Sequence, residues 1–406
     1  MDLSPTNRHN DPESRVVFIS PNPIDDFLGY SIRPAEIMSA LGRRGVEVHL
    51  LTPFPSRLPG VYNHLLERSV FSRVGLDKLV YLLGRRIVKS NGLSRLVLNP
   101  RMIRSLWRSL AKSAEPLVRG IEPDVIVGEQ DLAAMASVSL GEDLDIPVFA
   151  DLHDVWPLEE TFSGRACRGD STWETLSELD REIVSRADRT ILVGLEMKRV
   201  LENTLSVGVE KPIILPNASS SKSIPKIQKN PGGMVYAGNL ERWECVDLVI
   251  EAAARIHRDF SVNLAIVGRG DQTKHLERMA GKMGLPGSVK GALPRSEVFS
   301  FISHFDVGLV STNKPYALPI KFFDYMSVGL PVISVDGSWA DIIRRERVGM
   351  VCSPDRVSMA EAMETMLYDG VDLEGMGERG VAAVGERYNW DAAVCDLVEE
   401  TKKRAS

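Results

Sequence analysis

The chain has 406 residues, and this length favours two or more domains. Its composition is that of a soluble globular protein, with 44% hydrophobic residues, 26% charged residues and a net charge of −6. It contains no apolar run of the ~18–20 residues that a transmembrane helix needs, and its polar start, MDLSPTNRHNDPESR, is unlike a signal peptide. The four cysteines are far apart and lack metal-binding spacing, which is typical of buried thiols in a reducing compartment. We therefore expect a cytoplasmic protein.

The first half of the chain alternates short apolar runs with helical stretches. Residues 1–14 are polar, and we expect them to be disordered. Near-continuous apolar strands that alternate with helices indicate a parallel sheet covered on both faces. We therefore predict an N-terminal Rossmann-like domain over residues 15–218. Its expected strands are VVFIS (16–20), VEVHLL (46–51), DVIVGE (124–129), PVFADL (147–152), RTILVG (189–194) and PIILPN (212–217).

A basic helical insertion, residues 64–119, interrupts this alternation because it is too long for a single crossover helix. It carries twelve cations and three acids, a charge of about +9 within a chain of −6. Apolar residues such as Leu82, Leu106 and Trp107 recur in it at helical spacing. A basic amphipathic helix can lie on an anionic membrane surface or hold an anionic lipid-linked substrate. The alternative is a pair of crossover helices with a solvated basic face, and without a recognised motif nucleic acid is not an expected partner.

The stretch 218–233, ASSSKSIPKIQKNPGG, is small, polar and interrupted by Pro and Gly, which predicts a linker over residues 219–232. A second domain is predicted over residues 233–388, followed by a C-terminal helix within 389–406 that packs back on the first domain. Two sets of βα units joined by one linker imply two Rossmann-like domains that face each other across a cleft. The expected strands of the second set are GMVYAGN (233–239), VNLAIVG (262–268), SVKGAL (288–293), VGLVST (307–312), PVISVD (331–336) and GMVCSP (349–354).

The loop PNPIDDFLGY, residues 21–30, follows the first strand and leads into a helix. Gly29 would let an anion approach the backbone amides closely, and Arg33 lies one turn further on. This is not a GxGxxG motif, and a plain turn is the alternative.

The motif DLHDVWP, residues 151–157, ends the fourth expected strand, where loops line the cleft. Asp151 or Asp154 would orient the ring of His153, which would then hydrogen-bond a substrate hydroxyl or carry a proton. A structural histidine is the alternative.

Two glycine turns follow the first two strands of the second domain, Gly238-Asn239 and Gly268-Arg269. Both lie on the edge that faces the cleft, where a nucleotide would approach the backbone, and Arg269 would face its base or a phosphate. Each motif alone is common, and a tight βα turn is the alternative reading of each.

The stretch ALPIKFFDYMSVGLPVIS, residues 317–334, predicts a loop, a short helix, a glycine stop and a buried strand. Lys321 and Asp324 are three positions apart and so lie near one face of the helix. A helix that starts behind the carboxyl end of a strand is where α/β proteins usually hold phosphates. An ordinary surface Lys and Asp on an amphipathic helix is the alternative.

Taken together, these motifs resemble the GT-B glycosyltransferases, in particular the large retaining family 4. The resemblance is strongest over residues 233–354, where YAGNL, DLVIEAA, AIVGRGD, VKGALPRSEV, FDVGLVST and LPIKFFDYMSVGLPVIS run in family order at family spacing. In the first domain, His153-Asp154 resembles the family's HD element and residues 215–217 its PNG element. An ordered set of this kind is far more specific than any single motif.

The resemblance implies roles for individual residues. Asp324 falls where the family has the second glutamate of its E-x7-E motif, which binds the donor ribose hydroxyls. Lys321 matches a lysine that meets the diphosphate, and His153 matches the histidine near the transferred sugar. Gly29 matches the glycine-rich loop near the donor phosphates.

Several positions depart from the family pattern. The first acid of E-x7-E would fall at Tyr316, and the second is the aspartate Asp324. The family's diphosphate-binding Arg and Lys align with Asn239 and Glu244, and Arg242 is the nearby cation that would compensate. These departures put the phosphate contacts in question.

The resemblance implies a metal-independent transfer, in which cations and helix N-termini stabilise the leaving diphosphate. Asp143-Leu-Asp145 has the spelling of a metal-binding DxD motif but lies in a turn before the fourth strand, so we discount it. We expect no metal and no cofactor, with a UDP- or GDP-type sugar as co-substrate.

The function that follows is a retaining glycosyltransferase acting on a polysaccharide or lipid-linked glycan acceptor, peripheral on the inner face of the membrane. A catalytically degenerate homologue that binds nucleotide or scaffolds glycan synthesis is the main alternative. A nucleotide-sugar 2-epimerase is a lesser one, because the cleft acids that it would need are not identifiable.

Overall fold

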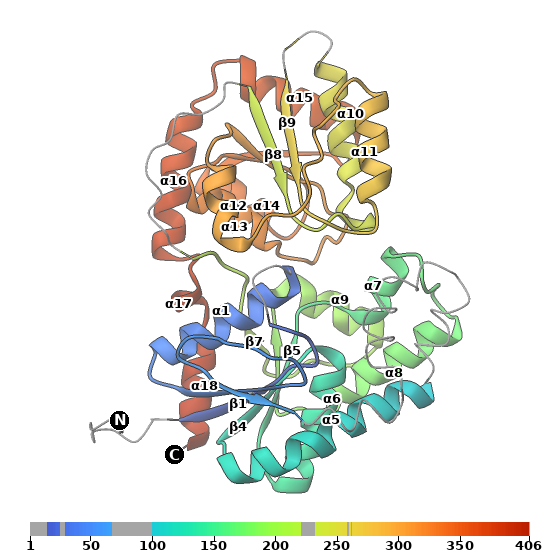
Figure 1. The fold of residues 1–406 in the computed structure, drawn as a ribbon, viewed down its shortest axis with the longest axis vertical. Helices are drawn as coiled ribbons and strands as arrows, with labels where there is room; N and C mark the ends of the chain where they lie inside the picture. Colours follow the sequence, from blue (N-terminus) through green and yellow to red (C-terminus); the bar gives the residue numbers. More distant parts are fainter. Residues whose placement is uncertain are drawn as a thin grey trace.

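Two parallel β-sheets, one from each half of the chain, form the centres of two α/β units that lie one above the other (Figure 1). The structure is a computed structural model and describes residues 14–24, 29–66, 100–220, 232–257, 260 and 262–405. Helices lie on both faces of the sheets, which confirms the predicted class of two Rossmann-like domains. The expected disorder of residues 1–14 falls outside the described residues except at Ser14, whose carbonyl accepts a hydrogen bond from the Glu47 N–H at 2.9 Å.

The first unit contains a seven-stranded sheet in the order β3-β2-β1-β4-β5-β6-β7, with all strand pairs parallel. Successive side chains of β1 alternate between two cores: Val16 and Phe18 pack on the side of α1, and Val17 and Ile19 on the side of α5 and α6. The strands are β1 (Arg15–Ile19), β2 (Glu47–Thr52), β3 (Tyr62–Leu65), β4 (Val125–Glu129), β5 (Val148–Leu152), β6 (Arg189–Leu192) and β7 (Ile213–Ile214). The helices are α1 (Gly29–Arg43), α5 (Pro100–Ile121), α6 (Gln130–Leu144), α7 (Trp156–Phe162), α8 (Ser171–Arg186) and α9 (Leu195–Leu205).

The second unit contains a five-stranded parallel sheet in the order β12-β11-β10-β8-β9. Its strands are short and rich in Val and Ile, as buried parallel strands require. They are β8 (Gly233–Ala237), β9 (Asn263–Val267), β10 (Val307–Val310), β11 (Val332–Val335) and β12 (Gly349–Cys352). The helices are the 3₁₀ turn η1 (Arg242–Glu244), α10 (Val246–Ile256), α11 (Thr273–Lys282), α12 (Arg295–Ile302), α13 (Ile320–Ser327), α14 (Ala340–Glu346), α15 (Arg356–Tyr368) and α16 (Leu373–Glu386).

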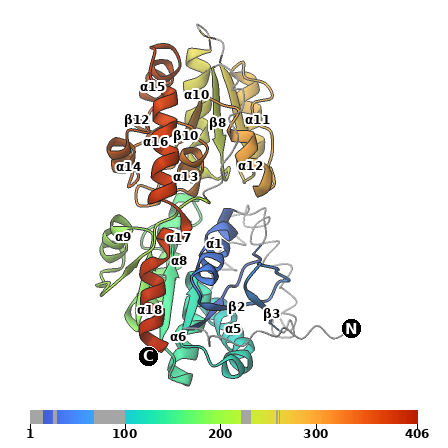
Figure 2. The ribbon, with the colours of Figure 1, turned by 90° about the vertical axis from the view of Figure 1, so that its left-hand side faces the viewer.

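Two stretches of chain pass between the units side by side. The Ser219 N–H donates to the Tyr388 carbonyl at 3.0 Å, and Ser219 forms a parallel bridge with Asn389. Beyond this crossing, α17 (Trp390–Ala393) contacts α1, and α18 (Cys395–Ala405) contacts β1 and β7. Figure 2 shows α16, α17 and α18 following one another down one side of both units. The C-terminal helices thus lie on the first unit, and residues 221–231 of the expected linker lie outside the described part.

Two expectations about local structure differ from the structure. His64, taken as the start of the basic insertion, lies in the edge strand β3, where it pairs with Leu51 of β2. Residues 67–99 of the insertion lie outside the described residues, and its last part forms α5. The expected strand SVKGAL forms only one bridge, between Val289 and Ile266, because Gly291 turns the chain with a φ of 77°.

The strand orders create a switch point in each sheet, between β1 and β4 in the first and between β8 and β10 in the second. At such a point the connections leave in opposite directions, and ligands of α/β proteins bind outside the carboxyl ends of the strands there. Glu129 ends β4, His153 follows β5 and Gly238 follows β8, so the motifs of both units reach these edges. The topology therefore brings the candidate residues to the space between the units.

Candidate active site

A cavity of about 260 Å³ lies between the two units. Most of its lining comes from the second unit, at the turns after β8 and β9, the start of α12 and the start of α13. The first unit contributes Ile32, Arg33, His153 and Asn217. The second unit contributes Ala237, Gly238, Asn239, Glu244, Val267, Gly268, Arg269, Ala292, Leu293, Arg295, Val298, Pro319, Ile320, Lys321 and Asp324.

The charged residues of this lining are four cations and two carboxylates. The cations are Arg33, Arg269, Arg295 and Lys321, and the carboxylates are Glu244 and Asp324. The lining therefore carries a formal excess of two positive charges, although the whole chain is acidic. A concave site with such an excess attracts anionic ligands.

Lys321 stands in the first turn of α13, and its side chain is 9% exposed. Its Nζ donates to the Tyr236 hydroxyl at 3.0 Å and to Glu244 Oε2 at 2.5 Å. The side chain fits here because residue 238 is glycine: a Cβ on Gly238 would stand 2.5 Å from Lys321 Cε. The Tyr236 hydroxyl in turn donates to the Asn239 carbonyl at 2.8 Å, which fixes the turn after β8. The local sequence thus places one ammonium group beside this turn.

Asp324 lies one turn further along α13 and is 4% exposed. Its carboxylate accepts a bidentate fork from the guanidinium of Arg295, with Nη1 on Oδ2 and Nη2 on Oδ1 at 2.8 Å. Ser219, at the crossing between the units, donates to Oδ1 at 2.7 Å. The Phe299 ring lies 4.5 Å from the Arg295 guanidinium carbon, in cation–π contact. Asp324 therefore links α12, α13 and the crossing.

His153 brings an imidazole ring to the cavity from the loop after β5. Burial lowers its pKa to about 4, although the charge of Asp151 acts in the opposite direction. Its Nε2 lies at hydrogen-bond distance from the Gln130 side chain, and its buried Nδ1 has no partner among the described residues. His153 is therefore neutral near pH 7 and able to exchange a hydrogen bond with a ligand hydroxyl.

Arg33 in α1 organises the first unit's edge of the cavity and is 2% exposed. Its guanidinium donates to Asp151 Oδ1 at 2.9 Å and to the Leu215 carbonyl and Asn217 Oδ1 at 3.0 and 2.9 Å. Asn217 in turn donates to the Leu318 carbonyl at 2.6 Å, across the gap between the units. This chain of hydrogen bonds connects β5 to the loop that precedes α13.

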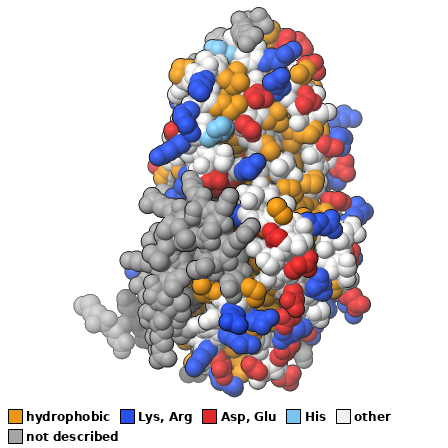
Figure 3. Space-filling view, turned by 90° about the vertical axis from the view of Figure 1, so that its right-hand side faces the viewer, with side chains coloured by type: hydrophobic (Ala, Val, Ile, Leu, Met, Phe, Trp, Pro, Cys, Tyr) orange, Lys and Arg blue, Asp and Glu red, His pale blue; other side chains and the backbone are white. Residues whose placement is uncertain are grey.

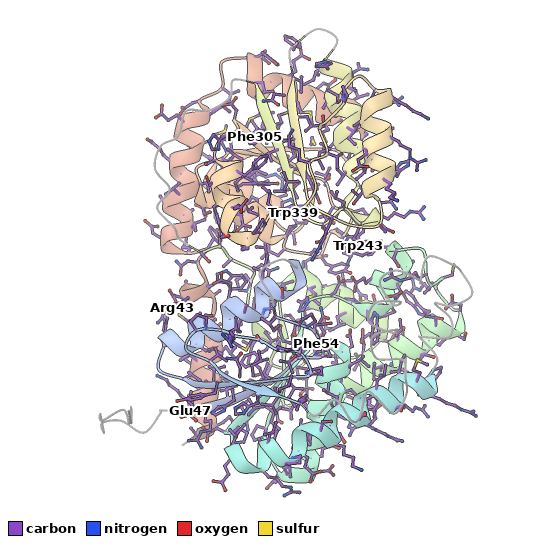
Figure 4. All side chains as sticks on the ribbon, in the orientation of Figure 1. Arg43, Glu47, Phe54, Trp243, Phe305 and Trp339 are labelled. Carbon is purple, nitrogen blue, oxygen red and sulfur yellow. The ribbon has the colours of Figure 1, made fainter. Side chains whose placement is uncertain are left out.

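A second set of contacts joins the units beside the cavity, and we call Lys314, Tyr316, Asp154 and Glu159 the Lys314 cluster. Lys314 Nζ forms an ion pair with Asp154 and lies 3.6 Å from Glu159 Oε1. The Tyr316 hydroxyl donates to Asp154 Oδ1 at 2.6 Å. Lys314 Nζ also lies 4.6 Å from the ring centre of Trp243, which Figure 4 labels where the two units meet. The carboxylate of Asp154 is therefore occupied by contacts between the two units.

The structure brings seven of the ten predicted site residues into the cavity lining: His153, Gly238, Asn239, Gly268, Arg269, Lys321 and Asp324. Asp154 is not among them, because Lys314 and Tyr316 hold its carboxylate. Arg242 also lies outside the lining, because its Nη1 reaches Gly164 of the first unit, 3.2 Å from where a Cβ would stand. Gly29 is the first residue of α1, but residues 25–28 before it lie outside the described part, so its phosphate contact stays a prediction.

Arg295 and Lys314 were not predicted from the sequence as functional residues. Arg295 stands within the quoted segment VKGALPRSEV, but nothing in its spacing to Asp324 in the sequence marks the two as partners. Lys314 lies between an expected strand and Tyr316, where a lysine reads as a surface residue. Each residue is recognised only through its contact with a segment that is distant in the chain.

Glu129, at the end of β4, is 1% exposed. Burial raises the pKa of its carboxyl group to about 8, although a hydrogen bond from Ser20 acts to lower that pKa. Between pH 4.5 and about 8 the folded chain binds one proton that the unfolded chain releases, so stability falls as pH rises through this window. We expect Glu129→Gln to raise the thermal midpoint, most near pH 8 and least near pH 5. Scanning calorimetry at both pH values checks this, with the exposed Glu364→Gln as the control variant. An equal rise of the thermal midpoint at pH 5 and at pH 8 would contradict the prediction.

Among the described residues, no group of three or more His, Cys, Asp or Glu side chains is arranged to hold a metal ion. Within the same residues, no helix combines the length and apolar character needed to cross a bilayer.

Comparisons with known proteins bear on both units. A family model described as Glycosyltransferase Family 4 matches residues 29–219, and one described as Glycosyl transferases group 1 matches residues 232–369. The comparison with curated proteins gave no match.

Solved structures of similar fold cover nearly the whole chain. Sucrose-phosphate synthase from Thermosynechococcus elongatus is 16% identical with a TM-score of 0.75, over 96% of this chain and 98% of that one. HepE from Anabaena, in complex with UDP-glucose, is 14% identical with a TM-score of 0.72, over 96% and 99%. WaaG, a glycosyltransferase involved in lipopolysaccharide biosynthesis, is 16% identical with a TM-score of 0.68, over 94% and 99%. The two family models, which together match both units, and this shared fold identify the chain as a GT-B glycosyltransferase belonging with the group 1 and family 4 enzymes.

Proposed function

We propose that the chain transfers a sugar, with retention of anomeric configuration, from a UDP- or GDP-type sugar to a polysaccharide or lipid-linked glycan. The observation that carries this proposal is the cavity between the units, which includes the turns at the carboxyl ends of β8 and β9 and whose lining as a whole has a formal excess of two positive charges. A nucleoside diphosphate is an anion that suits such a site. HepE, a protein of similar fold, was solved with UDP-glucose, which supports the nucleotide class.

In this proposal different residues of the cavity contact different parts of the donor. Lys321 and the N-terminus of α13 stabilise the charge that develops on the leaving diphosphate as the sugar–phosphate bond breaks. The turns at Gly238 and Gly268 let the nucleotide approach the backbone. Neutral His153 hydrogen-bonds a hydroxyl of the transferred sugar, and the leaving phosphate accepts the acceptor's proton. Because these groups supply the positive charge, the proposal includes no metal and no resident cofactor.

The test is an assay of the purified chain with radiolabelled UDP- and GDP-sugars and a membrane extract as acceptor. We expect label to pass from one donor class into a glycan or lipid fraction, and product NMR to show the donor's anomeric configuration. An inverted product would contradict retention alone. Binding of nucleotide without transfer or hydrolysis of any donor would favour the degenerate homologue. That alternative is supported by Glu244 and Tyr316, since the first neutralises Lys321 and the second replaces an expected acid.

We also propose that α5 binds the anionic surface of a membrane, where a lipid-linked acceptor would lie. Its cations are exposed and recur mainly at three- and four-residue spacing along one side of the helix: Arg101, Arg104, Arg108, Lys112 and Arg119. The opposite side is buried in the first unit through residues such as Leu110 and Ala114. Figure 3 shows Lys and Arg side chains, with acids beside them, in the lower part of the face on which α5 lies. This arrangement supports peripheral attachment, with each cation near the surface contributing about 1 kcal/mol.

The membrane proposal predicts that reversing three of these charges abolishes flotation with anionic liposomes. In Arg104→Glu/Arg108→Glu/Lys112→Glu, three attractions become repulsions, so binding at low salt is expected to fall by more than about 100-fold. Flotation with phosphatidylglycerol vesicles measures it. A matched control reverses Lys274, Arg278 and Lys282, which are exposed at the same spacing on α11 of the second unit. Equal loss in both variants, or no binding by the wild-type chain, would contradict the role of α5.

A further inference from the structure

We propose that Arg295 is the residue of the α12–α13 edge that contacts a phosphate of the donor, and that Asp324 positions it. This inference rests on the proposed donor class and departs from the ribose contact that the family resemblance implies for Asp324. It concerns how the nucleotide is held and not which sugar is transferred.

Most of the acceptor capacity of Asp324 is already used. A carboxylate offers about four lone-pair positions, two on each oxygen. Oδ1 already accepts from Ser219 at 2.7 Å and from Arg295 Nη2 at 2.8 Å, and Oδ2 accepts from Arg295 Nη1. Binding two neighbouring ribose hydroxyls would require two free positions, and only one remains, on Oδ2. Asp324 therefore cannot accept a hydrogen bond from both hydroxyls while it holds Ser219 and Arg295.

Arg295 has N–H donors beyond those that contact Asp324. Its fork to Asp324 uses one N–H on Nη1 and one on Nη2, and a guanidinium has five N–H groups. Three N–H groups therefore remain outside the fork. The side chain lines the cavity and is 17% exposed, so these donors are next to the space a ligand would fill. Lys321 has a smaller reserve, because two of the three donors of its ammonium are directed at Tyr236 and Glu244.

The guanidinium of Arg295 is held in one orientation by its neighbours. Asp324 fixes one edge of the guanidinium, and the Phe299 ring lies against the group at 4.5 Å. The neighbouring charge of Asp324 also raises the pKa of Arg295 against the effect of burial, so the cation is retained. A guanidinium that is already oriented loses little conformational entropy when it binds, and its planar set of donors matches phosphate oxygens. The geometry therefore suits a phosphate contact by Arg295.

The experiment compares the affinity of the full chain for UDP and for uridine, with GDP and guanosine as the second pair, by calorimetry and ligand-observed NMR. Arg295→Gln is expected to weaken diphosphate binding by about ten- to hundredfold and to leave nucleoside binding unchanged. Asp324→Asn loosens the fork and is expected to act in the same direction, again on the diphosphate alone. Arg278→Gln, exposed on α11 of the same unit and outside the cavity lining, is the control and should change neither.

Three outcomes separate the possibilities. If Asp324→Asn weakens uridine and UDP by the same factor, Asp324 holds the ribose and the inference is overturned. If Arg295→Gln leaves UDP affinity unchanged, the phosphate contact is likewise overturned. If the wild-type chain binds neither UDP nor GDP, the proposed function itself fails, which is a different result from a change among variants. Thermal melting of each variant verifies folding, and Arg295→Lys, which keeps the charge without the fork, is expected to bind UDP better than Arg295→Gln.

Discussion

Replacing Lys321 by Ala is expected to lower kcat/KM for sugar transfer by about 100- to 1,000-fold, the effect of removing one preorganised group that stabilises developing negative charge. Lys321 lies in the first turn of α13, beside the turn at Gly238, where the leaving diphosphate would lie. The loss should appear mainly in kcat, because charge on the diphosphate increases as the bond to the sugar breaks. Initial-rate kinetics with the donor identified by the transfer assay measures it.

The substitution also leaves Glu244 without its partner inside the cavity, where it would repel a diphosphate. The double variant Lys321→Ala/Glu244→Gln separates the two effects, since it removes both charges. We expect its kcat to stay low, because the missing ammonium is the cause. Recovery to near the wild-type kcat would show that Lys321 serves only to neutralise Glu244. Lys282→Ala, an exposed lysine at the end of α11, is the control for a lysine distant from the cavity.

The fold was predictable because it depends on a pattern that is local in the sequence. Runs such as VVFIS and VNLAIVG are apolar on both faces, so they are stable only between layers of helices, and their alternation with helical segments requires parallel connections. The edge strand β3 was not predicted from the sequence, because Tyr62 and Leu65 are more than half exposed and the segment lacks an apolar run. Strand pairing at a sheet edge depends on the neighbour, here β2, and not on the segment's own residues.

The candidate site was predictable at the positions where glycines and a helix start follow strands. Gly238, Gly268 and Lys321 line the cavity because the carboxyl ends of parallel strands meet at one edge. The ion pairs in and beside the site were not predictable, because pairs between distant segments of the chain follow no sequence spacing. Arg295 with Asp324 and Lys314 with Asp154 are separated by 29 and 160 positions, and only folding brings them together.

Replacing Lys314 by Met is expected to destabilise the chain by about 3 kcal/mol, the low end for a broken buried ion pair because Asp154 remains 21% exposed. Lys314 is 4% exposed and is the cation that faces Asp154 and Glu159 across the gap between the units. Methionine keeps much of the packing on Trp243 but leaves both carboxylates without that charge. Calorimetry gives the shift of the thermal midpoint, and small-angle scattering gives the radius of gyration, which should increase as the units separate.

The pH dependence of this effect has a defined sign. Burial raises the pKa of Glu159 to about 7, and Lys314 acts to lower it, so removing Lys314 raises that pKa further. The folded variant then binds a proton that the unfolded chain releases over a wider range, and its stability falls more steeply as pH rises. The destabilisation by Lys314→Met should therefore be larger near pH 8 than near pH 5, and Asp154→Asn in the same chain should reduce it. Lys290→Met, exposed in the same unit, is the control. An unchanged midpoint and radius at both pH values would mean that the Lys314 cluster does not hold the units together. The arrangement of the units would then depend on other contacts, such as those of Asn217 and Ser219.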